Sequence, residues 1–108
     1  MKGLVLCLVL AASLAQVAQA AAVPAPERQR QLIRMVRQDC GSCHGMTLKG
    51  GLGSPLLPQN LRDKPPTSLV ATILYGRAGT AMPPWQSKLD DAEAAWIVEQ
   101  LLNGFPNE

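Results

Sequence analysis

Apolar side chains recur with a helical period in three stretches of the chain. In the first, from Glu27 to Cys43, they share one side of a helical wheel, while Arg30, Arg34 and Arg37 share the other. The apolar side holds Leu32, Ile33, Met35, Val36, Cys40 and Cys43. Both cysteines are therefore expected to point into the core. Asp39 falls within the same apolar arc, and a regular helix does not account for it.

A long loop and a short helix are predicted next. The segment from Gly45 to Pro66 is rich in glycine and proline, which argues against a regular element, and such a loop in a small domain usually wraps something. Thr67 or Ser68 can then cap a helix that runs through Tyr75 and stops at Gly76. The apolar positions of this helix are Leu69, Val70, Ile73 and Leu74.

The last helix carries the strongest signals. Asp90 is expected as its N-cap, Glu93 three residues later completes a capping box, and an apolar stripe continues until Gly104. The stripe consists of Ala94, Ile97, Val98, Leu101 and Leu102. Trp96 lies off this stripe, so it is either partly exposed and able to contact a partner protein, or covered by another element. The sequence shows no strand pattern and no internal repeat.

The N-terminus predicts export. Lys2 supplies a positive charge, Leu4–Leu14 is an apolar run too short to cross a bilayer, and small residues follow at the expected cleavage site. These features predict a signal peptide over residues 1–20, cleaved near Ala20 to Ala22, then a flexible leader over residues 21–26 and one domain over residues 27–108. An uncleaved membrane anchor is the alternative. Export would place the mature protein in the periplasm, without stable membrane insertion.

Cleavage would change the composition. It would remove Cys7 and leave Cys40 and Cys43 in an oxidising compartment, where a free pair tends to oxidise unless something else binds it. It would also remove Lys2 and so lower the formal net charge of +2 by one, which does not indicate a nucleic acid partner. Aromatic residues make up 4% of the sequence, a poor supply for a core. Another group is therefore expected to fill the middle of the domain.

Five consecutive residues, "CGSCH" from Cys40 to His44, carry the candidate chemistry. They fit C-x-x-C-H, the attachment sequence of a c-type haem. Two thiols one helical turn apart can each add to a vinyl group on the same porphyrin edge, and the adjacent imidazole then faces the iron. The pattern predicts one covalently bound haem c, with Cys40 and Cys43 as the attachment residues and His44 as an iron ligand.

Two other uses of the motif remain open. A disulfide or a redox-active dithiol also uses C-x-x-C, although such a pair usually lies at a helix N-terminus, whereas this pair ends a helix and precedes a histidine. A zinc site would have Cys40, Cys43 and His44 and would need a carboxylate as its fourth ligand.

The second axial position of a haem iron decides between electron transfer and chemistry on a small molecule. The chain has no second histidine, Met46 is too near His44 in sequence to reach the opposite face, and Met35 lies on the core stripe of the first helix. Met82 remains, in "AGTAMPPW", where two prolines would stiffen the approach of its thioether. The alternative is that Met82 fills a gap in the core. Trp85 is expected to pack over this loop near the haem edge.

The order of these features resembles class I cytochromes c over Glu27 to Gly104. The resemblance implies an all-α fold of three to four helices with long loops around one haem, in which the first and last helices cross. It also implies that His44 and Met82 are the axial ligands. In that family a proline carbonyl accepts the N–H of the proximal imidazole, for which Pro55 is the candidate and Pro58 a rival.

Two stretches, "DCGSCHGMTLKGGLGSPL" and "GRAGTAMPPW", are more closely similar to the small NirC-type cytochromes c of denitrifying bacteria. This similarity implies a periplasmic electron carrier, with an upstream electron donor as one partner. A monomer is expected for a carrier of this size. Its acceptor would be the haem-cd nitrite reductase, or it would assist the maturation of that enzyme's special haem. The competing hypothesis is a haem enzyme or gas sensor, in which Met82 does not bind the iron or dissociates from it readily.

Overall fold

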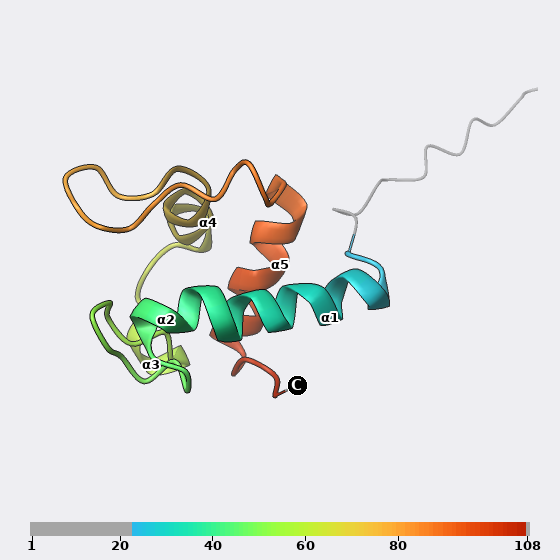
Figure 1. Ribbon diagram of the computed structural model, residues 1–108, viewed down its shortest axis with the longest axis horizontal. Coiled ribbons are helices and arrows are strands. Elements are labelled where there is room, and N and C mark those ends of the chain that lie inside the picture. The colour runs from blue at the N-terminus through green and yellow to red at the C-terminus, as the bar shows by residue number, and fades with distance from the viewer. Residues whose placement is uncertain (1–22, 108) are drawn as a thin grey trace, which may run out of the picture.

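The computed structural model describes residues 23–107, and the regular secondary structure of this part is helical throughout (Figure 1). A long first helix is followed by a single turn and two further helices. The elements are α1 (Pro26–Met35), η1 (Val36–Cys40), α2 (Gly41–His44), α3 (Pro58–Leu61), α4 (Pro66–Tyr75) and α5 (Asp91–Leu102). The all-α fold is confirmed. The predicted signal peptide lies outside the described residues, and none of the helices within residues 23–107 is long and apolar enough to cross a membrane.

The first helix is continuous from α1 through η1 to α2, because Val36 and Gly41 at the two junctions keep right-handed helical dihedral angles. η1 is a π-helical segment, in which each N–H bonds to the carbonyl five residues earlier, so its turn holds more residues than an α-helical turn. Asp39 is exposed, although the regular period placed it on the apolar side, while Val36 is fully buried. The π segment thus explains the misfit of Asp39 to the sequence pattern.

α4 begins earlier than the sequence predicted. Its N-cap is Pro65 and its first residue is Pro66, so the prediction of a Thr67 or Ser68 cap is wrong. Proline suits the first turn because its fixed φ is already helical and its missing N–H would have no partner there. The Ser68 hydroxyl instead donates to the Pro65 carbonyl at 2.8 Å. The predicted end is confirmed at Gly76, whose φ of +71° ends the helix.

The capping box of α5 is confirmed and extends into a tertiary contact. The Glu93 N–H donates to Asp90 Oδ1 at 2.7 Å, and the Asp90 N–H donates to Glu93 Oε1 at 3.1 Å. Arg28 of α1 forms an ion pair with the other oxygen of Glu93, and this bond holds the pKa of the Glu93 carboxyl below its usual range. Arg28 also donates to the Lys88 carbonyl at 3.2 Å. The start of the first helix is therefore tied to the start of the last.

α1 and α5 cross, as the resemblance implied (Figure 1). One buried cluster joins Leu32 of α1 and Val36 of η1 to α5 and to the loops. Its other members are Leu48, Leu61, Leu74, Leu89, Ala94, Trp96, Ile97 and Leu101. Burying one such aliphatic side chain contributes about 1.5–3 kcal/mol, so this cluster dominates the stability of the domain. Trp96 is 8% exposed, which confirms the alternative that another element covers it.

The three arginines on the polar side of the first helix, Arg30, Arg34 and Arg37, do not all face solvent. Arg30 is exposed and forms an ion pair with Glu27, one helical turn before it. Arg37 instead donates to the carbonyls of Phe105 and Pro106, both at 3.0 Å, and its guanidinium lies 5.3 Å from the centre of the Phe105 ring. Arg37 thereby holds the C-terminal segment against the first helix.

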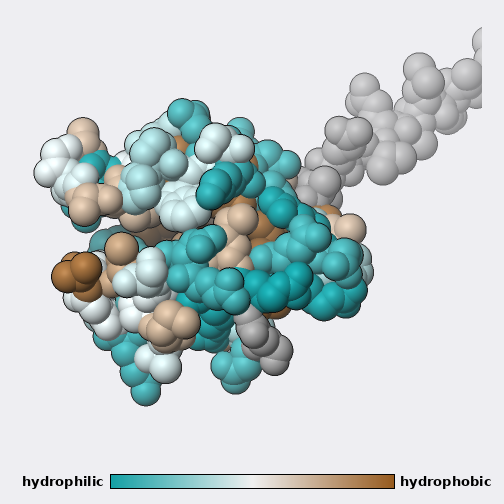
Figure 2. All heavy atoms as spheres, in the orientation of Figure 1, coloured by the Kyte–Doolittle hydropathy of each residue, from teal (hydrophilic) through white to brown (hydrophobic). Residues whose placement is uncertain are grey.

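The described part of the molecule has two lobes on the side away from the start of α1. One contains α4 and the loop over residues 76–90, and the other contains α2, α3 and the loop over residues 45–57 (Figure 1). Figure 2 shows a hollow between these lobes. The glycine- and proline-rich segment and the loop that carries Met82 therefore bound one opening. The prediction of no regular element from Gly45 to Pro66 is wrong, because α3 forms a single helical turn within that segment, started by Pro58.

Replacing the N-cap of α5 tests how much its start contributes to stability. Asp90→Ala removes the oxygen that accepts the Glu93 N–H, so we expect the free energy of unfolding to fall by about 1 kcal/mol. Asp90→Asn keeps an accepting oxygen and should remain within a few tenths of a kcal/mol of the wild type. Urea denaturation of the haem-loaded proteins measures both values. Equal losses in the two variants would show that the charge, and not the cap, matters.

Candidate functional site

The motif Cys40–His44 occupies the end of the first helix and spans the junction of η1 and α2. Both thiols are free. Cys40 is partly buried and packs against the core cluster, whereas Cys43 is exposed. The prediction that both cysteines point into the core is therefore correct for Cys40 only. Cys43 lies where a group outside the polypeptide core can reach it.

The environment of Cys40 argues against a reactive dithiol. Burial, together with the negative charge of Asp39, raises the pKa of the Cys40 thiol to about 11. Redox-active C-x-x-C pairs need the opposite shift, because the thiolate is the nucleophile. A zinc site is also disfavoured, because no three His, Cys, Asp or Glu side chains converge to hold a metal ion anywhere in residues 23–107.

His44 is oriented by one short hydrogen bond. Its Nδ1 lies 2.6 Å from the carbonyl oxygen of Ser54. A carbonyl can only accept, so Nδ1 carries the proton and Nε2 keeps its lone pair. The predicted partner, Pro55, is wrong by one residue, and Pro58 is also excluded as the partner. The imidazole is therefore held in the tautomer that binds a metal through Nε2.

The loop that supplies this carbonyl folds back over the end of α2. The N–H groups of Gly50 and Gly53 donate to the carbonyls of His44 and Cys43, at 2.8 and 2.7 Å. These bonds satisfy carbonyls that a helix end would otherwise leave without partners. A Cβ atom at Gly53 would lie 2.7 Å from both Nδ1 and Cε1 of His44. Only glycine allows the backbone to approach the imidazole so closely.

Leu48 fastens the same loop to the core. Its side chain is 2% exposed, yet its φ is +60°, the one positive value among the non-glycine residues of the described chain. This conformation costs about 1–2 kcal/mol for a residue with a side chain. The Leu48 N–H donates to the Gly45 carbonyl at 2.8 Å, and its carbonyl accepts from Leu56 at 2.9 Å. Burial and these two bonds offset the strain and fix where the loop begins.

Met82 is held by its backbone within the second loop. The Arg77 N–H donates to the Met82 carbonyl at 3.3 Å, and the Met82 N–H donates to Thr80 Oγ1 at 3.3 Å. A Cβ atom at Gly76 would lie 2.6 Å from the Met82 carbonyl oxygen, so this turn also depends on glycine. The side chain of Met82 is half-buried.

Two further bonds attach this loop to the end of α4. The Trp85 N–H donates to the Ile73 carbonyl at 3.0 Å, and the Gln86 N–H donates to the Leu74 carbonyl at 3.1 Å. Trp85 also packs against the core cluster, with the ammonium of Lys88 5.5 Å from the centre of its ring. The loop that carries Met82 is thus anchored on both sides of that residue.

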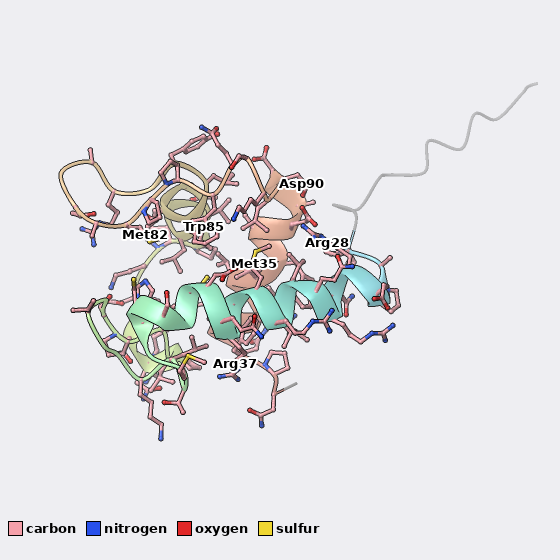
Figure 3. The ribbon with its side chains drawn as sticks, in the orientation of Figure 1. Arg28, Met35, Arg37, Met82, Trp85 and Asp90 are labelled. Atoms are coloured by element: carbon pink, nitrogen blue, oxygen red, sulfur yellow. The ribbon has the colours of Figure 1, made fainter. Side chains whose placement is uncertain are left out.

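Met35 and Met46 lie where the sequence predicted, away from the position expected for the second axial ligand. Met35 packs against the core cluster, between α1 and α5, while Met82 lies in the lobe of α4, across the hollow from α2 (Figure 3). Met46 is 62% exposed, and its sulfur lies 3.6 Å from the Cβ position of Gly41. An imidazole with an available lone pair, two thiols and a thioether in the opposite lobe form a donor set that suits a haem c.

Sequence reasoning missed the residues that orient His44. Neither the Ser54 carbonyl nor the close contact at Gly53 was predicted, because a backbone group carries no side-chain signature. The available signal was the "GGLG" stretch six residues after the motif, which indicated a loop but not its path.

Comparison with known proteins identifies the family of the chain. The family model described as "Cytochrome C oxidase, cbb3-type, subunit III" matches residues 27–100. Cytochrome c55X of Stutzerimonas stutzeri is 51% identical over 86 residues, which cover 80% of this chain and 76% of that protein. The solved structure of a c-type cytochrome NirC is 53% identical, with a TM-score of 0.74, and the match covers 75% of this chain and 95% of that chain.

A larger protein contains a similar segment. The structure of the dihydro-heme d1 dehydrogenase NirN in complex with DHE matches 69% of this chain at 39% identity, with a TM-score of 0.62. The match covers 16% of the dehydrogenase chain, so the similarity concerns one part of that protein.

Replacing Gly53 tests the contact that orients His44. In Gly53→Ala the new methyl group would meet the imidazole, so the loop must move and the bond from Nδ1 to Ser54 must lengthen or break. We expect a several-fold lower ratio of bound haem to polypeptide, measured by absorbance of the purified protein. Leu52→Ala, one residue earlier and 96% exposed, is the matched control and should leave the ratio unchanged. Wild-type haem content in Gly53→Ala would show that the contact is not needed.

Proposed function

The chain belongs to the c-type cytochrome family described as cytochrome c oxidase, cbb3-type, subunit III, and on this basis we propose that it carries single electrons in the periplasm during denitrification. A cytochrome c domain holds haem c covalently. The bound haem supplies an iron that alternates between Fe(II) and Fe(III). The polypeptide attaches this group, orients its ligands and excludes water.

Four side chains would hold the haem. Cys40 and Cys43 would form the two thioether bonds, His44 would bind the iron through Nε2, and Met82 would bind it through the thioether sulfur. The free thiols, the protonated Nδ1 of His44 and the position of Met82 across the hollow support this assignment. The same four residues were predicted from the sequence.

The observation that carries the electron-transfer proposal is that both axial residues lie on anchored backbone. His44 is fixed through Ser54, and the Met82 loop is bonded to the end of α4 on one side and turns tightly at Gly76 on the other. Ligands that move little between oxidation states favour outer-sphere electron transfer. A haem enzyme or gas sensor would instead need an axial ligand that leaves the iron readily, so that a small molecule can bind in its place.

Two partners are proposed for this carrier. The first is the haem-cd nitrite reductase as electron acceptor, supported by the similarity to cytochrome NirC. The second is an enzyme that matures the special haem of that reductase, supported by the similarity to one segment of dihydro-heme d1 dehydrogenase. In that role the chain would accept electrons from the dehydrogenase. An export signal over residues 1–20, a leader over residues 21–26 and a monomeric domain over residues 27–108 complete the proposal.

Carbon monoxide binding tests whether Met82 occupies the second axial position of the haem iron. With Met82 bound, the reduced protein should not bind the gas promptly at neutral pH, whereas Met82→Ala should bind it within the mixing time. Met46→Ala is the matched control, because it removes an exposed thioether from another loop and should behave as the wild type. Absorbance after mixing measures all three. Prompt binding by the wild-type protein would contradict the six-coordinate assignment.

The donor role is tested with the nitrite reductase itself. The reduced, haem-loaded protein is mixed with haem-cd nitrite reductase and nitrite, and its reoxidation is followed by absorbance, with a control that omits nitrite. Fast oxidation that depends on nitrite is the expected result. An intact His/Met spectrum with negligible transfer would reject the donor role. Reduction of the ferric protein by dihydro-heme d1 dehydrogenase would then favour the maturation role.

A further inference from the structure

The segment from Arg77 to Met82 forms a closed turn in the lobe of α4. Its two ends are joined by the bond from the Arg77 N–H to the Met82 carbonyl, at 3.3 Å. Residues 78–81 between them are all exposed, and the loop projects away from the helices (Figure 1). A Cβ atom at Gly79 would meet nothing beyond its chain neighbours within 4 Å. Contact with the rest of the protein therefore does not fix the shape of this turn.

The side chain of Met82 does not pack into the core of the described chain. Trp85 packs against the buried cluster, whereas Met82 is not among the side chains that do so. The two residues after Met82 are prolines, which have no N–H to donate. The next backbone bond along the chain joins Trp85 to Ile73. The polypeptide therefore holds Met82 mainly through the hydrogen bonds of its own turn.

The hydroxyl of Thr80 makes two of these bonds. It donates to the Arg77 carbonyl at 2.8 Å and accepts from the Met82 N–H at 3.3 Å. The same carbonyl accepts from the Thr80 N–H at 3.1 Å. Within residues 23–107, Thr80 Oγ1 is the hydrogen-bond partner of the Met82 N–H. Threonine hydroxyls commonly stabilise turns by bonding to nearby backbone groups, and here one hydroxyl links the start of the turn to the methionine.

We propose that Thr80 is a positioning residue for Met82, whose hydroxyl sets how often the turn opens and Met82 leaves the second axial position. This inference rests on the proposed function, in which Met82 is the second axial ligand. A small ligand can bind only to the open molecules, so its apparent affinity is its affinity for the open state multiplied by the fraction that is open. The bonds of the Thr80 hydroxyl lower that fraction. Thr80 thus determines how well the protein excludes small ligands.

Imidazole binding to the ferric, haem-loaded protein tests this role. Loss of Met82 from the iron is followed through the far-red absorbance that a ferric haem shows when methionine is its ligand. Thr80→Val keeps the shape of the side chain but removes the hydroxyl. The apparent affinity for imidazole should rise about threefold to tenfold, the factor that corresponds to the net contribution of one hydrogen bond. Thr80→Ser keeps the hydroxyl and should stay within about twofold of the wild type.

Thr72→Val is the matched control for the loss of a hydroxyl. The Thr72 hydroxyl also donates to a backbone carbonyl, that of Ser68 at 2.9 Å, but it lies within α4. This variant should bind imidazole as the wild type does. Thr80→Ala is a second variant without the hydroxyl and should follow Thr80→Val, so that a misfit of valine does not decide the result.

Amide hydrogen exchange of the ferrous protein, measured by NMR, shows where the turn opens. The Met82 N–H should exchange faster in Thr80→Val and Thr80→Ala than in the wild type. The Trp85 N–H should keep its exchange rate in every variant, because its bond to Ile73 lies outside the turn. Equal acceleration of both amides would show that the whole loop loosens, which would contradict the role assigned to Thr80.

The outcomes separate this inference from the proposed function. Equal imidazole affinities of Thr80→Val and Thr72→Val would overturn the inference, as would a rise in Thr80→Ser equal to that in Thr80→Val. In both cases the wild type still shows methionine ligation, so the electron-carrier function stands. Absence of the far-red absorbance from the wild-type ferric protein would instead reject Met82 as the axial ligand, and this inference with it.

Discussion

The hydrogen bond from Nδ1 of His44 to the Ser54 carbonyl is the contact on which the site depends. It selects the imidazole tautomer and fixes the direction of Nε2. It also requires the following loop to return over the end of α2, where Gly50 and Gly53 cap the helix carbonyls. One contact therefore links the end of a helix, the path of a loop and the availability of a ligand atom. The loop needs glycine at Gly53 because a side chain there would collide with the imidazole, and at Gly50 because its φ is positive.

The scaffold around this contact is small and is held together at its two ends. Arg28 joins the first helix to the capping box of α5 and to the carbonyl of Lys88, near the end of the loop that carries Met82. Arg37 joins the same helix to the C-terminal segment. The buried cluster that includes Leu32 of α1 and Leu101 of α5 contributes most to the stability. The two arginines add polar contacts that join the first helix to α5 and to the C-terminal segment. Both lobes beside the hollow are attached to this frame.

Features that depend on side chains close in sequence could be predicted, and those that depend on backbone paths could not. The capping box of α5 was correct because Asp90 and Glu93 suffice to form it. The start of α4 was missed because two prolines read as loop residues, although they suit a first helical turn. Asp39 was misplaced because a fixed 3.6-residue period does not include a π segment. Pro55 was chosen instead of Ser54 as the partner of His44 because the sequence does not show which carbonyl the folded loop brings to the imidazole.

The π segment has a consequence for how this chain can vary in length. The π turn of η1 holds more residues than an α-helical turn for nearly the same rotation around the axis. Deleting one residue there would therefore let the helix become regular while Cys40, Cys43 and His44 kept nearly the same direction. Deleting one residue from the regular helix before Val36 would instead turn the motif by about 100° relative to the residues before the deletion. Residues 36–40 are thus the part of the first helix in which the length can change without redirecting the motif.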